Sequence, residues 1–182
     1  MGLLLLANAL LVLPPSQSQD ISSTEYREKA NFLAAFPNFI EWPTDSFNSL
    51  QAPFLLCVFG NFSFGTSLAQ TTQGLSIHGR RIEVRWARKD SDLRACQILF
   101  VSRSEEKRYA RIFKAIQGAS VLTVGETPDF LANGGAINFL FEDDKLQFEV
   151  NVAAANGARL RISSNMLVLA RRVIAKEEAA KS

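Results

Sequence analysis

The side chains that could perform covalent or metal chemistry are few, because this 182-residue chain has only two cysteines and one histidine. A zinc cluster built from cysteine and histidine needs four such ligands. Nucleophilic catalysis needs a base within hydrogen-bond reach of the nucleophile, and His78 has no second histidine to share that work. We therefore predict that the protein is not an enzyme and uses no metal or other cofactor.

The two cysteines lie at or beside apolar runs that are typical of strands. Cys57 lies within the run 54–59, and Cys96 opens the run that ends at Val101. In an oxidising compartment, two buried cysteines on neighbouring strands would pair, and closing a loop of about 40 residues is worth roughly 4 kcal/mol. The alternative is a pair of free, buried and inert thiols.

Small and polar residues follow two of the predicted strands, where ligands bind in open α/β sheets. The candidate crevice residues are Gly60, Asn61, Ser102 and Arg103. The loop 60–67 has the glycine spacing of a phosphate loop but lacks its lysine. A tight turn and a helix cap at Ser104 explain the same residues without a ligand, so a small-solute site is an alternative here.

The elements that would position these residues alternate between strand and helix. Apolar and alternating patterns predict strands at 54–59, 81–86, 97–101, 120–124, 136–141 and 146–150. Helices are predicted at 22–36, about 66–71, 104–116, briefly from 127, and from 163 or 164 to 174. The order predicts one compact Rossmann-like α/β domain over 22–175, with a mostly parallel sheet flanked by helices. A C-terminal hairpin around 142–145 would add an antiparallel edge.

The first predicted helix has signals at both of its ends. Ser22 and Glu25 have the spacing of a capping box, so we expect the helix to begin at Ser22. Pro37 must kink or end this helix, because proline removes a backbone donor.

The N-terminus resembles a secretory signal peptide over residues 1–18. The first 19 residues carry no charge, residues 3–13 are almost entirely apolar, and a small-residue site ends at Ser18. No Lys or Arg precedes the apolar run, as expected if the start of the leader is truncated or misassigned. We therefore expect export, and fraying of the polar tail 176–182. A core helix is the alternative, but its two prolines argue against it.

The charge balance excludes some classes of function. A net charge of +2 and a pI near 8.7 are too mild for a dedicated nucleic-acid binder. No apolar run reaches the roughly 18–20 residues of a membrane-spanning helix. Residues 80–94 and 103–114 each carry a net charge of +3, whereas 126–149 carry −5. Such runs are either solvated faces or a surface that orients a protein partner.

Seven segments, taken in order, resemble the YfiR family of bacterial periplasmic proteins. They are 26–33 with 39–43, 56–60 with 64–65, 79–85, 92–102, 121–124, 134–139 and 161–164. The resemblance runs from about Tyr26 to Val173. It implies a compact periplasmic α/β domain without enzymatic activity, and a disulfide between Cys57 and Cys96, which fall on family cysteine positions. Pro37 departs from the family pattern, and a second disulfide known in part of the family has no counterpart here.

The resemblance also implies a function in signalling. The namesake restrains a membrane diguanylate cyclase by contacting its periplasmic part, and an outer-membrane lipoprotein relieves this restraint. We expect a similar inner-membrane partner here, with a lipoprotein and a second copy of the chain as further candidate partners. Tryptophan and arginine are enriched at interface hot spots. The candidate partner surface is therefore Trp42, Arg80, Arg85 and Trp86.

Overall fold

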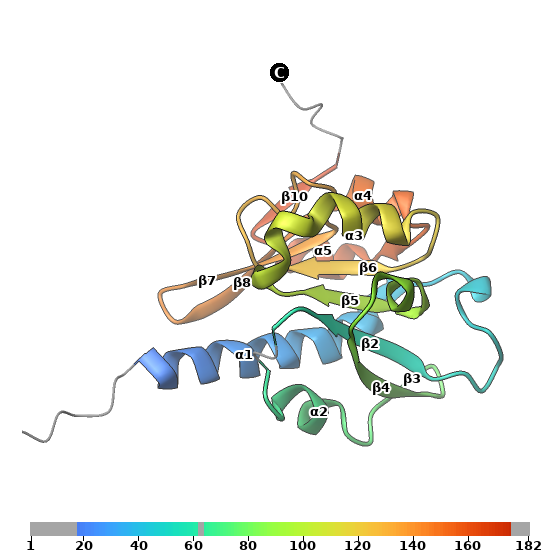
Figure 1. The fold of residues 1–182 in the computed structure, drawn as a ribbon, viewed down its shortest axis with the longest axis horizontal. Helices are drawn as coiled ribbons and strands as arrows, with labels where there is room; N and C mark the ends of the chain where they lie inside the picture. Colours follow the sequence, from blue (N-terminus) through green and yellow to red (C-terminus); the bar gives the residue numbers. More distant parts are fainter. Residues whose placement is uncertain (1–17, 62–63, 176–182) are drawn as a thin grey trace, which may run out of the picture.

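The protein forms a single mixed α/β domain (Figure 1), described here from a computed structural model that covers residues 18–61 and 64–175. Side chains are described from residue 24 onward. The predicted signal peptide, apart from Ser18, and the predicted tail 176–182 lie outside the described residues.

An eight-stranded sheet runs through the domain in the order β10-β8-β7-β6-β5-β2-β4-β3. The five strands β7, β6, β5, β2 and β4 are mutually parallel, which confirms the mostly parallel α/β class. The strands are β2 (Phe54–Phe59), β3 (Ser76–Ile77), β4 (Arg80–Ala87), β5 (Ile98–Val101), β6 (Leu122–Gly125), β7 (Ile137–Glu142), β8 (Lys145–Asn151) and β10 (Arg172–Ile174). A separate ladder pairs β1 (Ile40–Glu41) with β9 (Arg161–Ile162).

Helices cover both faces of this sheet. In Figure 1, α1 and α2 lie below the sheet and α3 lies above it. The α-helices are α1 (Ser18–Ala35), α2 (Ser67–Thr72), α3 (Tyr109–Ile116), α4 (Val152–Gly157) and α5 (Ser164–Leu169). The 3-10 helices are η1 (Phe36–Phe39), η2 (Thr44–Ser46), η3 (Asp90–Ala95) and η4 (Arg103–Arg108).

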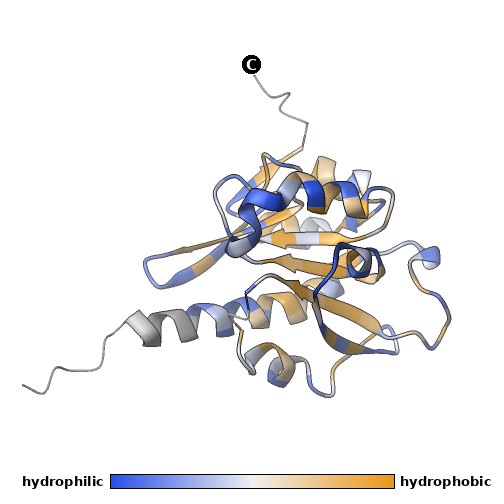
Figure 2. Ribbon diagram, in the orientation of Figure 1, coloured by the Kyte–Doolittle hydropathy of each residue, from blue (hydrophilic) through white to orange (hydrophobic). Residues whose placement is uncertain are grey.

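Two apolar cores form because successive side chains of a strand point to opposite faces. Along β2, Phe54, Leu56 and Val58 join the core between the sheet and helices α1 and α2. The residues between them join the core between the sheet and α3. All six β2 side chains are buried. The central strands are accordingly among the most hydrophobic segments in Figure 2, as expected for a parallel sheet covered on both faces.

The first helix differs from its prediction at one end. It already includes Ser18, the first residue that the structure describes, so the predicted capping box at Ser22 lies inside the helix. A capping box favours a start but does not impose one, and residues 18–22 contain no proline or glycine to stop an extra turn. The other end is confirmed: α1 stops at Ala35, and Pro37 occupies the first turn of η1, where its missing donor costs least.

The edge of the sheet at the C-terminal region differs from the prediction. The last helix ends at Leu169 instead of 174, and Arg172, Val173 and Ile174 form β10 parallel to β8. The predicted hairpin of β7 and β8 is present, but β10 is the edge strand beside it. Two β-branched residues favour the strand, and the Arg172 guanidinium donates to both carboxylate oxygens of Glu149, its partner in register.

Three smaller expectations are also wrong. The brief helix predicted from Thr127 is a series of turns. Ser104 does not cap a helix, because the preceding Ser102 is the N-cap residue of η4 and Ser104 binds the loop after β2 instead. Cys96 lies between η3 and β5 rather than within a strand.

Candidate functional site

The four crevice residues do meet at the carboxyl ends of β2 and β5. The Ser102 amide donates to the Phe59 carbonyl (2.9 Å), and the Asn61 amide donates to Ser104 Oγ (3.0 Å). Gly60 has a φ of +104°, and a Cβ added there would lie 2.6 Å from Ser104 Oγ. The protein's own side chains therefore occupy the space beside Gly60, and solute binding at these residues stays a prediction.

A buried charged cluster, which residue type and spacing did not predict, lies at the same end of the sheet one strand further along. Lys29 Nζ of α1 lies 2.5 Å from Glu126 Oε2, and each of the two side chains is only 1% exposed. Tyr26 donates to both oxygens of that carboxylate (3.1 and 3.0 Å), and the Arg103 amide donates to Oε1 (2.8 Å). Lys29 also pairs with Glu25. These hydrogen bonds satisfy the polar atoms of the buried ion pair, so the cluster stabilises the packing of α1 against the sheet.

A second buried polar contact lies nearby. The Tyr109 hydroxyl of α3 and Thr127 Oγ1 are 2.8 Å apart. Burial raises the pKa of Tyr109, although the hydrogen bond with Thr127 opposes this shift. Tyr109 and Thr127 thus add a second paired polar contact at the carboxyl end of the sheet.

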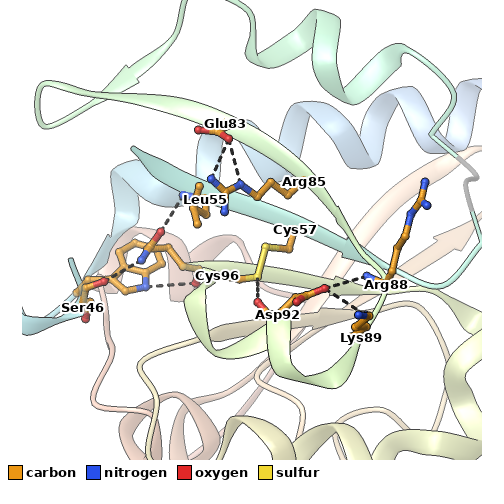
Figure 3. Close-up of a disulfide and its surroundings, with 11 residues drawn as sticks. Ser46, Leu55, Cys57, Glu83, Arg85, Arg88, Lys89, Asp92 and Cys96 are labelled. Atoms are coloured by element: carbon orange, nitrogen blue, oxygen red, sulfur yellow. Dashed lines mark hydrogen bonds and ion pairs between the residues drawn. A yellow bond between two sulfur atoms is a disulfide. The ribbon is translucent and has the colours of Figure 1, made fainter. Parts of the chain in front are cut away.

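The amino end of the sheet is organised around the side chain of Gln97. Gln97 Oε1 accepts from the Leu55 amide (2.7 Å), and Nε2 donates to the Ser46 carbonyl (2.9 Å). The Gln97 backbone carbonyl accepts from the indole of Trp42 (3.3 Å). Figure 3 shows these contacts beside the disulfide. One buried glutamine therefore holds the loop 42–53 against β2 and β5.

The two cysteines are joined at this end, as the sequence predicts. Cys57 of β2 and Cys96 form a disulfide with a Cα–Cα distance of 5.8 Å, and both residues are buried (Figure 3). The bond connects β2 to Cys96, the residue after η3, and the Asp92 carboxylate holds the start of η3 by accepting from the amides of Arg88 and Lys89. It therefore fixes the segment that leads into β5.

A cleft of about 350 Å³ opens beside the disulfide. We call it the basic cleft, because Arg85, Arg94 and Arg159 line it and Asp45 is the one acidic residue among its lining residues. Arg94 donates to the carbonyls of Ala115 and Gln117, and Arg159 pairs with Asp45. Such a surface is suited to contacts with carboxylates or other anionic groups.

A smaller hollow of about 160 Å³ lies between the loop 42–53 and the β3–β4 hairpin. We call it the aromatic groove; its lining residues are Ile40, Glu41, Trp42, Phe47, Phe54, Ile77, His78 and Arg80. Trp42 meets Phe54 edge to face, with ring centroids 5.0 Å apart. The Arg80 guanidinium lies 4.0 Å from the centroid of the Phe47 ring. It also donates to the carbonyls of Ser49 and Ala52 (2.8 and 2.7 Å).

The four residues of the predicted partner surface do not form one patch. Trp42 and Arg80 line the aromatic groove, whereas Arg85 lines the basic cleft and pairs with Glu83. Trp86 is partly buried against the core between the sheet and α1, on the sheet face opposite its neighbour Arg85. A role of these residues in partner binding stays a prediction.

Two features often sought in such a site are absent from the part of the chain that the structure describes. No group of three or more His, Cys, Asp or Glu side chains is arranged to hold a metal ion. No described helix is both long and apolar enough to cross a bilayer.

Comparison with known protein families assigns the chain to one of them. The YfiR/HmsC-like family model matches residues 26–171. The chain belongs to the YfiR/HmsC-like family. This family is known as regulatory rather than catalytic. The match spans the domain from α1 to the segment before β10, so it includes both ends of the sheet.

Solved structures of similar fold are distant in sequence. A conserved domain protein from Vibrio cholerae O1 biovar El Tor is 10% identical, with a TM-score of 0.54 over 81% of this chain. An ABC domain from Streptococcus pneumonia in complex with L-Trp is 9% identical, with a TM-score of 0.52 over 82% of this chain. The matched region covers 60% of the length of each of these chains, and the likeness concerns the fold alone.

Proposed function

We propose that this protein is a periplasmic, non-catalytic regulator that binds the periplasmic part of an inner-membrane signalling protein. Membership of the YfiR/HmsC-like family over residues 26–171 carries the proposal. The Cys57–Cys96 disulfide supports it, because disulfides persist in oxidising compartments such as the periplasm.

The partner in this proposal is a diguanylate cyclase, and the mechanism is a population shift. The regulator binds one conformation of the partner's periplasmic part more tightly than the other and thereby holds the cytoplasmic output low. The restraint cannot exceed the difference in binding free energy between the two conformations. An outer-membrane lipoprotein that binds the regulator would relieve the restraint by lowering the free concentration of regulator.

Deletion of the gene tests this proposal. Loss of the regulator should raise cellular cyclic-di-GMP and surface attachment, and a plasmid copy should restore both to the wild-type level. Cyclic-di-GMP that stays unchanged on deletion across several growth conditions would contradict a cyclase partner.

A periplasmic solute-binding module is the second candidate, and the size of the basic cleft favours it. Small-molecule sites usually measure about 300–1,000 Å³, and this cleft lies within that range at about 350 Å³. Thermal-shift titration with amino acids and nucleotides tests this candidate. A saturable rise in melting temperature that is lost in Arg94→Gln would support it.

A further inference from the structure

We propose that the aromatic groove binds one apolar side chain, of about the size of a phenyl ring, from the partner's periplasmic segment, and that Arg80 binds a carboxylate next to it. This inference rests on the proposed function, because it takes the partner to be a protein. It deepens that function by assigning a contact surface and the kind of sequence that fits it.

The size of the groove favours a single side chain over a whole small molecule. Its volume of about 160 Å³ is below the usual range of small-molecule sites. An apolar cavity of about 150 Å³ is known to accept benzene. The partly exposed rings of Trp42 and Phe47 supply apolar surface for such a ring, and the buried Phe54 and Ile77 lie behind them.

The walls of the groove are held in place before any partner binds. Trp42 is fixed by its bond to the Gln97 carbonyl and by its edge-to-face contact with Phe54. Arg80 donates to the carbonyls of Ser49 and Ala52, which holds the loop 42–53 against the β3–β4 hairpin. Binding to a preformed groove has a small cost in conformational entropy.

The charge at the rim favours an acidic neighbour. Among the described residues, Arg80 contacts two carbonyls and the face of Phe47 but no carboxylate, so its charge is not neutralised by an ion pair. Glu41, the acidic residue of the rim, has Arg161 within 3.8 Å. An incoming carboxylate would therefore gain a charge-assisted hydrogen bond with Arg80.

A further exposed apolar residue lies in the loop 42–53, whose carbonyls Arg80 binds. Leu50 is 85% exposed between the two anchored carbonyls of Ser49 and Ala52. Leu50 does not line the groove, but a partner segment that also covers the loop 42–53 would bury it. The fitting segment is thus an apolar residue beside Asp or Glu, with apolar character continuing nearby.

The two tryptophans allow a direct test by NMR. Trp42 lines the groove and Trp86 does not, so the two indole signals of the ¹⁵N-labelled protein provide a probe and an internal reference. The probes are the dipeptides acetyl-Phe-Asp-amide, acetyl-Phe-Lys-amide and acetyl-Ala-Asp-amide. Acetyl-Phe-Asp-amide should shift the Trp42 signal saturably and leave Trp86 in place. The Lys peptide should bind about tenfold more weakly, and the Ala peptide should cause no shift.

Variants of two adjacent arginines separate the charge effect from a folding effect. Arg80→Gln should abolish the preference for Asp over Lys. Arg80→Lys keeps the charge but loses the fork that holds Ser49 and Ala52, so it should keep the preference while binding both peptides more weakly. Arg81→Gln is the matched control, because Arg81 is exposed on the same strand but does not line the groove. Equal binding of the Phe and Ala peptides, equal shifts of both indoles, or no binding at millimolar peptide would overturn the proposal.

The peptide experiment and the gene deletion fail independently. If the groove binds Phe-Asp as described but deletion leaves cyclic-di-GMP unchanged, the groove proposal stands and the cyclase partner is wrong. If deletion raises cyclic-di-GMP but the Trp42 signal does not respond, the regulatory function stands and the groove is not the contact surface.

Discussion

The two ends of the parallel sheet differ in what their described residues do. At the carboxyl ends of the strands, Gly60 is packed against Ser104, and the Lys29–Glu126 pair is buried with its hydrogen bonds satisfied. At the amino ends, residues of the loop 42–53 line two hollows, the basic cleft and the aromatic groove. Ligands in open α/β sheets usually bind at the carboxyl ends. In this domain the residues at that end are occupied with holding α1 and the sheet together.

This difference suggests a division of work within the domain. Under the proposed function, the carboxyl end stabilises the fold and the amino end, with its two hollows, contacts the partner. Substitutions at the carboxyl end should therefore change stability, while those at the amino end should change binding with little loss of stability. The following predictions test that contrast in order of decreasing effect.

The largest effect is expected from breaking the buried ion pair. Glu126→Leu leaves the Lys29 ammonium buried without its main partner, which should lower the free energy of unfolding by about 3–5 kcal/mol. Urea denaturation followed by circular dichroism measures this change. Glu142→Gln is the control, because its pair with Arg171 is exposed and should contribute less than about 1 kcal/mol. Equal losses of unfolding free energy in the two variants would contradict the structural role of the Lys29–Glu126 cluster.

Removal of the disulfide should have the next largest effect. The double variant Cys57→Ala with Cys96→Ala should lose about 2–4 kcal/mol, because the unfolded chain regains the freedom of a loop that joins residues 39 apart. Urea denaturation of the variant and the oxidised wild type gives the difference. Mass spectrometry of periplasmic protein after alkylation without reductant supplies the check, and modification of both thiols would show that the bond is absent in the cell.

Gly60→Ala should cost about 2 kcal/mol, because alanine at this positive φ is strained and its Cβ meets Ser104 and Ser102. Gly74→Ala is the matched control, since Gly74 also has a positive φ but no atom within 4 Å of an added Cβ. Thermal unfolding should therefore show a larger drop in melting temperature for the first variant. Equal drops would mean that the filled crevice contributes nothing beyond backbone strain.

Tyr109 gives the smallest expected effect, and it appears at alkaline pH. Burial raises the pKa of its hydroxyl in the folded state, so the folded protein favours the protonated form. The resulting stability is complete below the pKa of the unfolded chain and is lost as pH rises through the higher folded value. Urea midpoints measured from pH 8 upward should decline less in Tyr109→Phe than in the wild type. Parallel declines would contradict this contribution.

The central strands could be predicted from the sequence because their signal is local. The runs around Cys57 and Leu99 are continuously apolar, and such runs bounded by turn residues are typical of strands covered on both faces. The residues around Val173 were harder to assign, because a short apolar stretch fits the end of a helix or an edge strand equally well. Its pairing with β8, through Arg172 and Glu149, decides the outcome.

The site features depend on contacts between segments that sequence spacing does not connect. Lys29 and Glu126 lie 97 residues apart, and the helical spacing of Glu25 and Lys29 is equally typical of an exposed pair. Trp42 and Arg80 could be proposed from residue type, but their shared groove depends on the anchoring of the loop 42–53. Residue type also grouped Arg85 with Trp86, although alternation along β4 places them on opposite faces.

The most direct test of the account compares the two ends of the sheet in one cellular assay. A deletion strain would carry the wild type, Arg80→Gln, Arg81→Gln or the double variant Lys29→Met with Glu126→Leu, which removes both charges of the buried pair together. Cyclic-di-GMP is measured at matched periplasmic levels of folded protein. The account predicts that Arg80→Gln fails to lower cyclic-di-GMP, whereas the double variant and Arg81→Gln restrain it as the wild type does. Full restraint by Arg80→Gln, together with lost restraint in the folded double variant, would contradict the assignment of the amino end as the working surface.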